Sequence, residues 1–202
     1  MRVLVACEFS GVVRDAFAAL GHDAWSCDLL PSERPGNHIQ GDCLAVLDQG
    51  WDLMIAHPPC TRLCNSGVLR LYKPGTMERD PVKWQEMERG AALFRALWDA
   101  PVQRIAIENP VMHGHALRLT GARHTQTIQP YQFGHPESKR TCLWLKSLPV
   151  LVPKNILQKP ECGYWQNQTP SGQNRLGPSP TRGQDRARTY AGIAQAMADQ
   201  WS

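Results

Sequence analysis

The chain has 202 residues, a length that suits a single domain with a hydrophobic core of useful size. Its composition is globular, with 42% hydrophobic and 20% charged residues and a mean hydropathy of −0.40. No apolar run approaches the length of a membrane span, and the start MRVLVACEFS lacks the architecture of a signal peptide. We therefore expect a soluble, cytoplasmic protein whose seven cysteines are reduced.

The first half of the chain alternates predicted strands with predicted helices. A β-branched run over 2–6 precedes apolar residues at helical spacing over 12–20, and a second strand follows over 23–28. An apolar strand over 51–57 runs into two prolines. A helix begins at Asp80-Pro81 and stops before Pro101, and another buried strand covers 103–109. This order is typical of nucleotide-binding α/β sheets.

The second half predicts two further strands, over 125–130 and 141–145, paired antiparallel, and a last helix over 189–201. Between them, prolines alternate with Gly, Gln and Asn, and the hydrophobic periodicity fades. We expect a catalytic domain formed by 1–148 and 189–202. Residues 149–188, the basic segment, are expected to be rich in loops and ordered only with a partner.

The charge is unevenly spread. The net charge is +4, but nine Lys or Arg against two acids give residues 139–188 a charge of +7, and the remainder carries −3. A local excess of positive charge suits a polyanionic partner. In this region Trp165, beside Tyr164, is a candidate for stacking on a base.

Three predicted strand ends carry polar residues. CEFSG follows the first strand, HPPC follows the strand over 51–57, and IENP ends the strand over 103–109. The carboxyl ends of parallel strands meet at one edge, where open α/β sheets bind ligands. Because proline cannot donate to a strand ladder, Cys60 lies on a stiffened loop at this edge. It is a candidate nucleophile or metal ligand, and Cys64 is expected to be a packing residue.

Taken in order, the motifs resemble the cytosine-C5 DNA methyltransferase family over most of the chain. They are Phe9-Ser10-Gly11, Asp28, Gly41-Asp42-Cys43, Pro58-Pro59-Cys60 with Ser66-Gly67, Glu108-Asn109-Pro110, Ser138-Lys139-Arg140-Thr141 and the final GIAQAMADQW. The resemblance implies a Rossmann-like class I sheet that binds S-adenosyl-L-methionine. It also implies methylation of cytosine C5 in DNA, with the base flipped out of the duplex or single-stranded.

The resemblance also implies catalytic roles. Cys60 would add to C6 of cytosine as a thiolate, which makes C5 nucleophilic. Glu108 would contact N3, and a carboxyl that partly keeps its proton is useful there, as burial favours. Asn109 would hold the Glu108 loop. Lys139, in preference to Arg140, would reach the cytosine O2.

For the cofactor, the resemblance assigns Phe9, Ser10 and Gly11 to the methionine end, although Val13 and Arg14 stand where the family turn has glycines. Asp28 would accept from the ribose hydroxyls and Asp42 from the adenine amino group. Cys43 and Pro58 would also contact the cofactor, next to these residues. No metal is expected.

Family members that read DNA sequence carry a recognition domain that has no counterpart in the basic segment. We therefore expect a short or relaxed target, or a protein partner, and the compact chain fits a phage or prophage gene. Three alternatives stay open: a C5 methyltransferase acting on a pyrimidine nucleotide or RNA, a non-catalytic DNA- or cofactor-binding module, and a metal-dependent nuclease or redox protein. The last would use His57, Cys60, His113 and His115.

Overall fold

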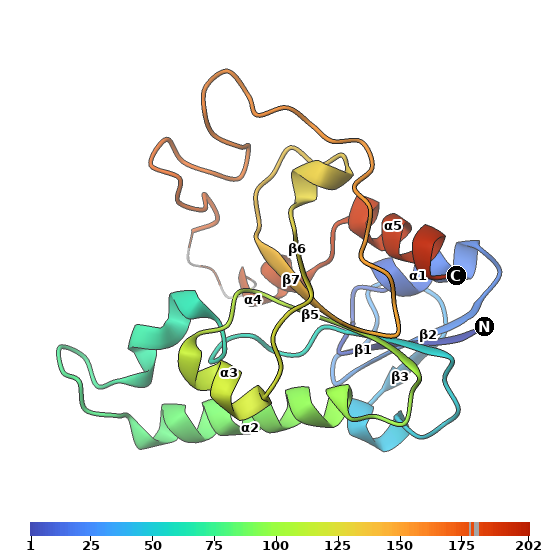
Figure 1. Ribbon diagram of the computed structural model, residues 1–202, viewed down its shortest axis with the longest axis horizontal. Helices are drawn as coiled ribbons and strands as arrows, with labels where there is room; N and C mark the ends of the chain where they lie inside the picture. The colour runs from blue at the N-terminus through green and yellow to red at the C-terminus, as the bar shows by residue number, and fades with distance from the viewer. Residues whose placement is uncertain (178, 180–181) are drawn as a thin grey trace.

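One mixed sheet organises the chain (Figure 1). The computed structural model describes residues 1–177, 179 and 182–202, and within them the strands take the order β3-β2-β1-β4-β5-β7-β6. The strands are β1 (Arg2–Ala6), β2 (Asp23–Asp28), β3 (His38–Gln40), β4 (Leu53–Ala56), β5 (Arg104–Asn109), β6 (Gln126–Ile128) and β7 (Thr141–Lys146). The first five are parallel, and β7 runs antiparallel to both β5 and β6. This topology confirms the expected Rossmann-like α/β sheet.

Helices cover both faces of the sheet, as Figure 1 shows. They are α1 (Val12–Ala19), α2 (Pro81–Trp98), α3 (Gly114–Thr120), α4 (Arg182–Ala187) and α5 (Ala191–Trp201), with short 3-10 turns η1 (Cys43–Val46), η2 (Asn65–Leu71) and η3 (Pro130–Phe133). No helix in the described part of the chain has the length and apolar character needed to cross a bilayer.

The side chains of each central strand alternate between two hydrophobic clusters. Leu4 and Ala6 of β1 pack on the face covered by α2 and α3. Val3 and Val5 pack on the opposite face, against α1 and α5. Burial on both faces is why these strands read as continuous apolar runs rather than as an alternation of apolar and polar residues.

Three elements were missed by the sequence prediction. The edge strand β3 has three residues and no hydrophobic periodicity to reveal it. Helix α3 begins in a stretch interpreted as a loop, because the His113 side chain accepts a hydrogen bond from the Ala116 N–H (3.1 Å) and caps the helix. Helix α4 lies within the basic segment, of which residues 178, 180 and 181 are outside the described residues.

Side-chain contacts connect the basic segment to η3 and to the loop before β7. Trp165 stacks on Tyr131 with ring centroids 4.6 Å apart. The Asn167 side chain accepts from the Ser138 N–H (3.0 Å) and donates to the Ser138 carbonyl (2.9 Å). No helix or strand is found among the described residues between Lys146 and Arg182, as the loss of periodicity indicated.

The close approach of α5 to η3 gives a test of this packing. A Cβ on Gly192 would lie 2.0 Å from the Phe133 carbonyl oxygen. We expect Gly192→Ala to lower the free energy of unfolding by about 1–3 kcal/mol, because this overpacking outweighs the better helix propensity of alanine. Urea unfolding measures the effect. Gly177→Ala is the control, since nothing lies within 4 Å of its Cβ, and an equal loss there would contradict the assignment.

Candidate active site

The ends of β1, β4 and β5 meet at one edge of the sheet. Ala56, the last residue of β4, pairs with Ala6 of β1 and Ile107 of β5. The next residue, His57, still donates its N–H to the Ala6 carbonyl (2.9 Å) before the prolines end the pairing. Because β7 is antiparallel and Cys142 pairs with Asn109, the residues that precede β7 arrive at the same edge.

A small cavity at this edge gathers four of the five predicted catalytic residues. It measures about 60 Å³. We call it the nucleophile pocket, and it is lined by His57, Pro58, Cys60, Glu108, Asn109, Pro110, Lys139 and Ala187. Arg140, the fifth, is exposed and lines a larger neighbouring cleft instead.

Asn109 fixes the loop that carries Cys60. Its side chain is 1% exposed, and its Nδ2 donates to the Pro58 carbonyl at 3.0 Å. A buried hydrogen bond between the end of β5 and the loop after β4 keeps these two segments together. Asn109 therefore holds the loop of the nucleophile rather than the loop of Glu108.

Glu108 and His57 form a buried ion pair. The His57 Nδ1 lies 2.9 Å from the Glu108 Oε2, and the two side chains are 9% and 12% exposed. The Thr189 hydroxyl donates to the same carboxylate oxygen from the loop after α4, at 3.4 Å. The carboxylate is thus oriented from two sides.

The expectation that Glu108 keeps part of its proton is wrong for this state of the protein. Burial alone would raise the pKa of Glu108, but the hydrogen bond from His57 and the charge of Lys139 outweigh it and lower the pKa to about 2. Burial likewise opposes the charge on His57, yet the bond to Glu108 raises the pKa of His57 above its ordinary value. Both shifts favour the form in which Glu108 is a carboxylate and His57 carries the proton.

Cys60 is half-buried and lies one turn before Cys64. The Cys60 carbonyl accepts from the N–H groups of Leu63 (2.9 Å) and Cys64 (3.0 Å). A hydrogen bond from the Cys60 thiol is the main cause that lowers the pKa of Cys64, to about 5, against the opposing effect of burial. Cys64 is therefore the acceptor of a hydrogen bond from the Cys60 thiol.

A second cavity, the acidic pocket, lies next to the nucleophile pocket. It measures about 160 Å³ and contains Asp28, Asp42 and Cys43, three of the predicted cofactor residues. Each aspartate uses one oxygen to accept a backbone N–H, from Leu30 and Leu44. The rest of the lining is Cys7, Cys27, Leu29, Gly41, His57, Pro59 and Leu93.

The chemistry of the acidic pocket fits the adenosine part of the expected cofactor. Two carboxylates that follow β2 and β3 can accept from hydroxyl and amino groups, and the apolar walls suit a flat ring. Pro58 lines the nucleophile pocket, whereas its neighbour Pro59 lines the acidic pocket.

The turn at residues 9–11 opens α1 as expected, but backbone N–H groups at the start of this helix already have hydrogen-bond acceptors within the protein. The buried Glu8 carboxylate accepts from the N–H groups of Val13 (2.7 Å) and Arg14 (3.2 Å), and from the Ser10 hydroxyl (3.3 Å). A Cβ on Gly11 would lie 2.5 Å from the guanidinium of Arg14, which is itself buried. The departure from the family's glycines therefore produces a turn closed from within by Glu8 and Arg14.

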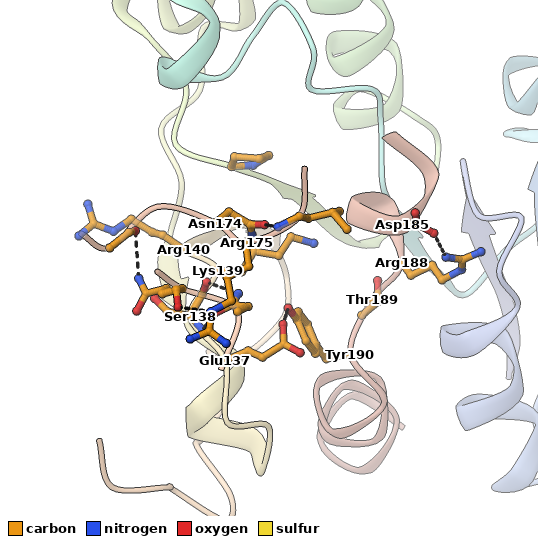
Figure 2. Close-up of a pocket in the computed structure, with 15 residues that line it drawn as sticks. Glu137, Ser138, Lys139, Arg140, Asn174, Arg175, Asp185, Arg188, Thr189 and Tyr190 are labelled. Atoms are coloured by element: carbon orange, nitrogen blue, oxygen red, sulfur yellow. Dashed lines mark hydrogen bonds and ion pairs between the residues drawn. The ribbon is translucent and has the colours of Figure 1, made fainter. Parts of the chain in front are cut away.

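Beyond the nucleophile pocket, a cleft of about 600 Å³ runs between the start of β7 and the basic segment (Figure 2). We call it the basic cleft. Its cations are Lys139, Arg140, Arg175 and Arg188. Of its two acids, Glu137 accepts from the Tyr190 hydroxyl (2.5 Å) and Asp185 from Arg188 (2.6 Å). The cleft is therefore predominantly positive.

The histidines considered as metal ligands and the tryptophan considered for base stacking contact other side chains or the backbone of the protein. Both ring nitrogens of His113 are engaged, with the Arg62 carbonyl (2.8 Å) and the Ala116 N–H, and His115 contacts the Tyr72 hydroxyl (3.1 Å). Within the described residues, no group of three or more His, Cys, Asp or Glu could hold a metal ion. Trp165 is 7% exposed against Tyr131, so the prediction that it stacks on a base is wrong.

Sequence reasoning missed His57, Glu8 and Thr189 as parts of the site. His57 stands directly before the Pro-Pro-Cys motif, but only its metal-binding capacity was considered. A polar residue that ends a buried strand was the available signal. Thr189 offered none, because its contact with Glu108 spans 81 residues of sequence.

The sequence matches no family model and no curated protein. Among solved structures, it is similar to a candidate DNA modification methyltransferase encoded within a prophage of E. coli, with 15% identity and a TM-score of 0.47, over 77% of this chain and 51% of that one. It is also similar to the methyltransferase EhMeth of Entamoeba histolytica, with 12% identity and a TM-score of 0.47, over 80% of this chain and 58% of that one. The chain thus spans little more than half the length of either.

The ion pair predicts a pH-dependent contribution to stability. Since the pKa of His57 is raised, its contribution is complete below an unfolded value of about 6.5 and is lost as the pH rises through the folded value. The contribution of Glu108 is present above about 4.3 and is lost as the pH falls toward its folded pKa of about 2.

We therefore expect His57→Gln to cost about 3–5 kcal/mol in unfolding free energy near pH 5.5, because it strands a buried carboxylate. The cost should shrink at alkaline pH, where His57 of the unmodified protein is also neutral. Urea unfolding of both proteins across this range measures the difference. A difference that does not change with pH would mean that the pair is not charged.

Proposed function

We propose that the chain is an S-adenosylmethionine-dependent methyltransferase that acts on C5 of cytosine in DNA through Cys60. The observation that carries the proposal is the meeting of Cys60, Glu108 and Lys139 in one cavity that shares a wall with the acidic pocket. A nucleophile, a carboxyl group and a cation around a small cavity suit a flat heterocycle with ring nitrogens and a carbonyl. Residues of three of the expected motifs line this one cavity, which supports the proposal.

In the proposed reaction the Cys60 thiolate adds to C6, forming a C–S bond and placing the electron pair of the C5–C6 double bond on C5, N3 and O2. Glu108 lies where it can contact N3, and Lys139 can stabilise charge that develops on O2. C5 would then be able to take the methyl group of a bound sulfonium cofactor, which would leave as the thioether. Loss of the C5 proton to water and expulsion of the Cys60 thiolate restore the aromatic ring. Cys64, whose pKa is lowered by a hydrogen bond from the Cys60 thiol, would accept the Cys60 proton before the addition.

The acidic pocket would hold S-adenosylmethionine, with Asp28 and Asp42 as acceptors for its ribose and adenine groups. When bound, the cofactor supplies an electrophilic methyl group. Because Glu8 already occupies the backbone donors of the α1 start, we infer that the carboxylate of the methionine end is held elsewhere.

The basic cleft supports a nucleic-acid substrate. It shares Lys139 and Pro110 with the nucleophile pocket, so a strand that lies in it can deliver one base to Cys60. The guanidinium groups of Arg140 and Arg175 suit phosphate oxygens. We propose that the basic segment is a reduced target-recognition element with a short or relaxed target, because few side chains are available to read base edges.

A covalent-adduct assay tests the reaction and the nucleophile. With cofactor and a 5-fluorocytosine oligonucleotide, we expect an adduct that survives denaturation, because fluorine at C5 cannot leave as a proton. Cys60→Ala should abolish adduct formation. Cys64→Ser should slow it roughly tenfold, since Cys64 would only accept the proton of the Cys60 thiol. Mass spectrometry measures the adduct on duplex DNA, single-stranded DNA and RNA, beside methyl transfer to free cytidine monophosphate. Undiminished adduct in Cys60→Ala would overturn the assignment.

Salt dependence tests the basic cleft. Arg140→Gln with Arg175→Gln should reduce the slope of log affinity against log salt by up to about 2 for duplex DNA, since each lost phosphate contact contributes about 0.9. Fluorescence anisotropy measures the slope. Arg89→Gln with Arg95→Gln is the matched control, because it removes the same charge from the exposed side of α2. Equal effects of the two pairs would show that the cleft is not the contact surface.

A further inference from the structure

His57 separates the acidic pocket from the nucleophile pocket and lines both. Its Nδ1 bonds to Glu108, while its Nε2 is buried and has no hydrogen-bond partner among the described residues. A buried polar atom without a partner is costly, so retention of a histidine here calls for an explanation beyond packing. The contact of Nδ1 with Glu108, at the wall between the two pockets, provides one.

The groups that face His57 favour its charged form. Glu108 at the end of β5 is the closest, Glu8 after β1 adds negative charge, and Lys139 before β7 opposes it. Burial also opposes the charge, but the net effect raises the pKa of His57. The other titratable groups that line the two cavities around it are Cys7, Cys27, Asp28, Asp42, Cys43 and Cys60.

The proposed reaction needs a proton that Glu108 does not itself hold. With a pKa of about 2, Glu108 is a carboxylate at neutral pH and can only accept from the base. Addition of a thiolate to C6 makes N3 more basic, and the adduct stays anionic unless N3 receives a proton. Within the described residues, the protonated group that touches Glu108 at 2.9 Å is His57.

We propose that His57 is a positioning residue that stores the proton required at N3 and delivers it through the Glu108 carboxyl group. This inference rests on the proposed function. The Glu108 Oε2 takes the proton from His57 Nδ1, and the carboxyl group formed in this way gives that same proton to N3. The imidazolium becomes neutral imidazole, Glu108 ends as the carboxylate, and the anionic adduct becomes neutral. The reverse transfer accompanies expulsion of Cys60.

The pH profile of adduct formation tests the proposal. In the unmodified protein the rate of adduct formation should fall at alkaline pH with a midpoint above 6.5. That midpoint should match the titration of His57 followed by NMR in the free protein. In His57→Gln the midpoint should move to lower pH, because only Glu108 can then hold the proton, and the rate at pH 8 should fall roughly 100-fold. Added imidazole should restore part of the rate in His57→Gly.

His113→Gln is the matched control, because it removes another buried histidine near the Cys60 loop that has no contact with Glu108. This variant should keep the original midpoint of the pH profile, even if its rate of adduct formation changes. Adduct in the unmodified protein with an unmoved midpoint in His57→Gln would overturn the inference alone. If His57→Gln does not fold, disagreement between the NMR titration and the rate profile of the unmodified protein would overturn it. Absence of adduct at every pH would overturn the proposed function and the inference together.

Discussion

The hydrogen bond between Asn109 and the Pro58 carbonyl is the contact on which the site depends. Two consecutive prolines free the chain from the sheet after β4, but they also leave a carbonyl that no strand partner can satisfy. The amide at the end of β5 satisfies it at 3.0 Å. Cys60 is thereby held beside Glu108, the residue that precedes Asn109. One buried bond thus sets the separation of the proposed nucleophile from the proposed carboxyl group.

The second constraint is electrostatic. Glu108 is almost fully buried, and an isolated carboxylate there would become protonated rather than remain charged. His57, Thr189 and Lys139 keep it ionised from three different segments. Because these segments come from the ends of β4 and α4 and from the start of β7, the charge on Glu108 links the sheet edge to the basic segment.

The residue pattern of the sequence predicted β1, β2, β4, β5, β6 and β7, but not the short edge strand β3. The convergence of Cys60, Glu108 and Asn109 followed from the rule that parallel strands end at one edge, whereas Lys139 reaches that edge because β7 is antiparallel. The predictions that failed concerned features that depend on tertiary contacts. The state of Glu108 is decided by a histidine 51 residues away, and the fate of Trp165 by stacking on Tyr131. The cap of α3 by His113 and the closure of the α1 turn by Glu8 and Arg14 are likewise invisible in a residue pattern.

The antiparallel direction of β7 has a consequence for how the protein can change. The strand starts at the edge of the site and ends at the far edge, so the chain must travel back before Thr189 can reach Glu108. This return path is the basic segment, which is tied to the rest of the protein at Leu151, Trp165 and Asn167. Its described residues take no part in the strand ladder. Doubling the length of such a loop costs only about 0.6 kcal/mol in closure entropy. Evolution or engineering can therefore lengthen the reach over a substrate here while the strand framework stays the same.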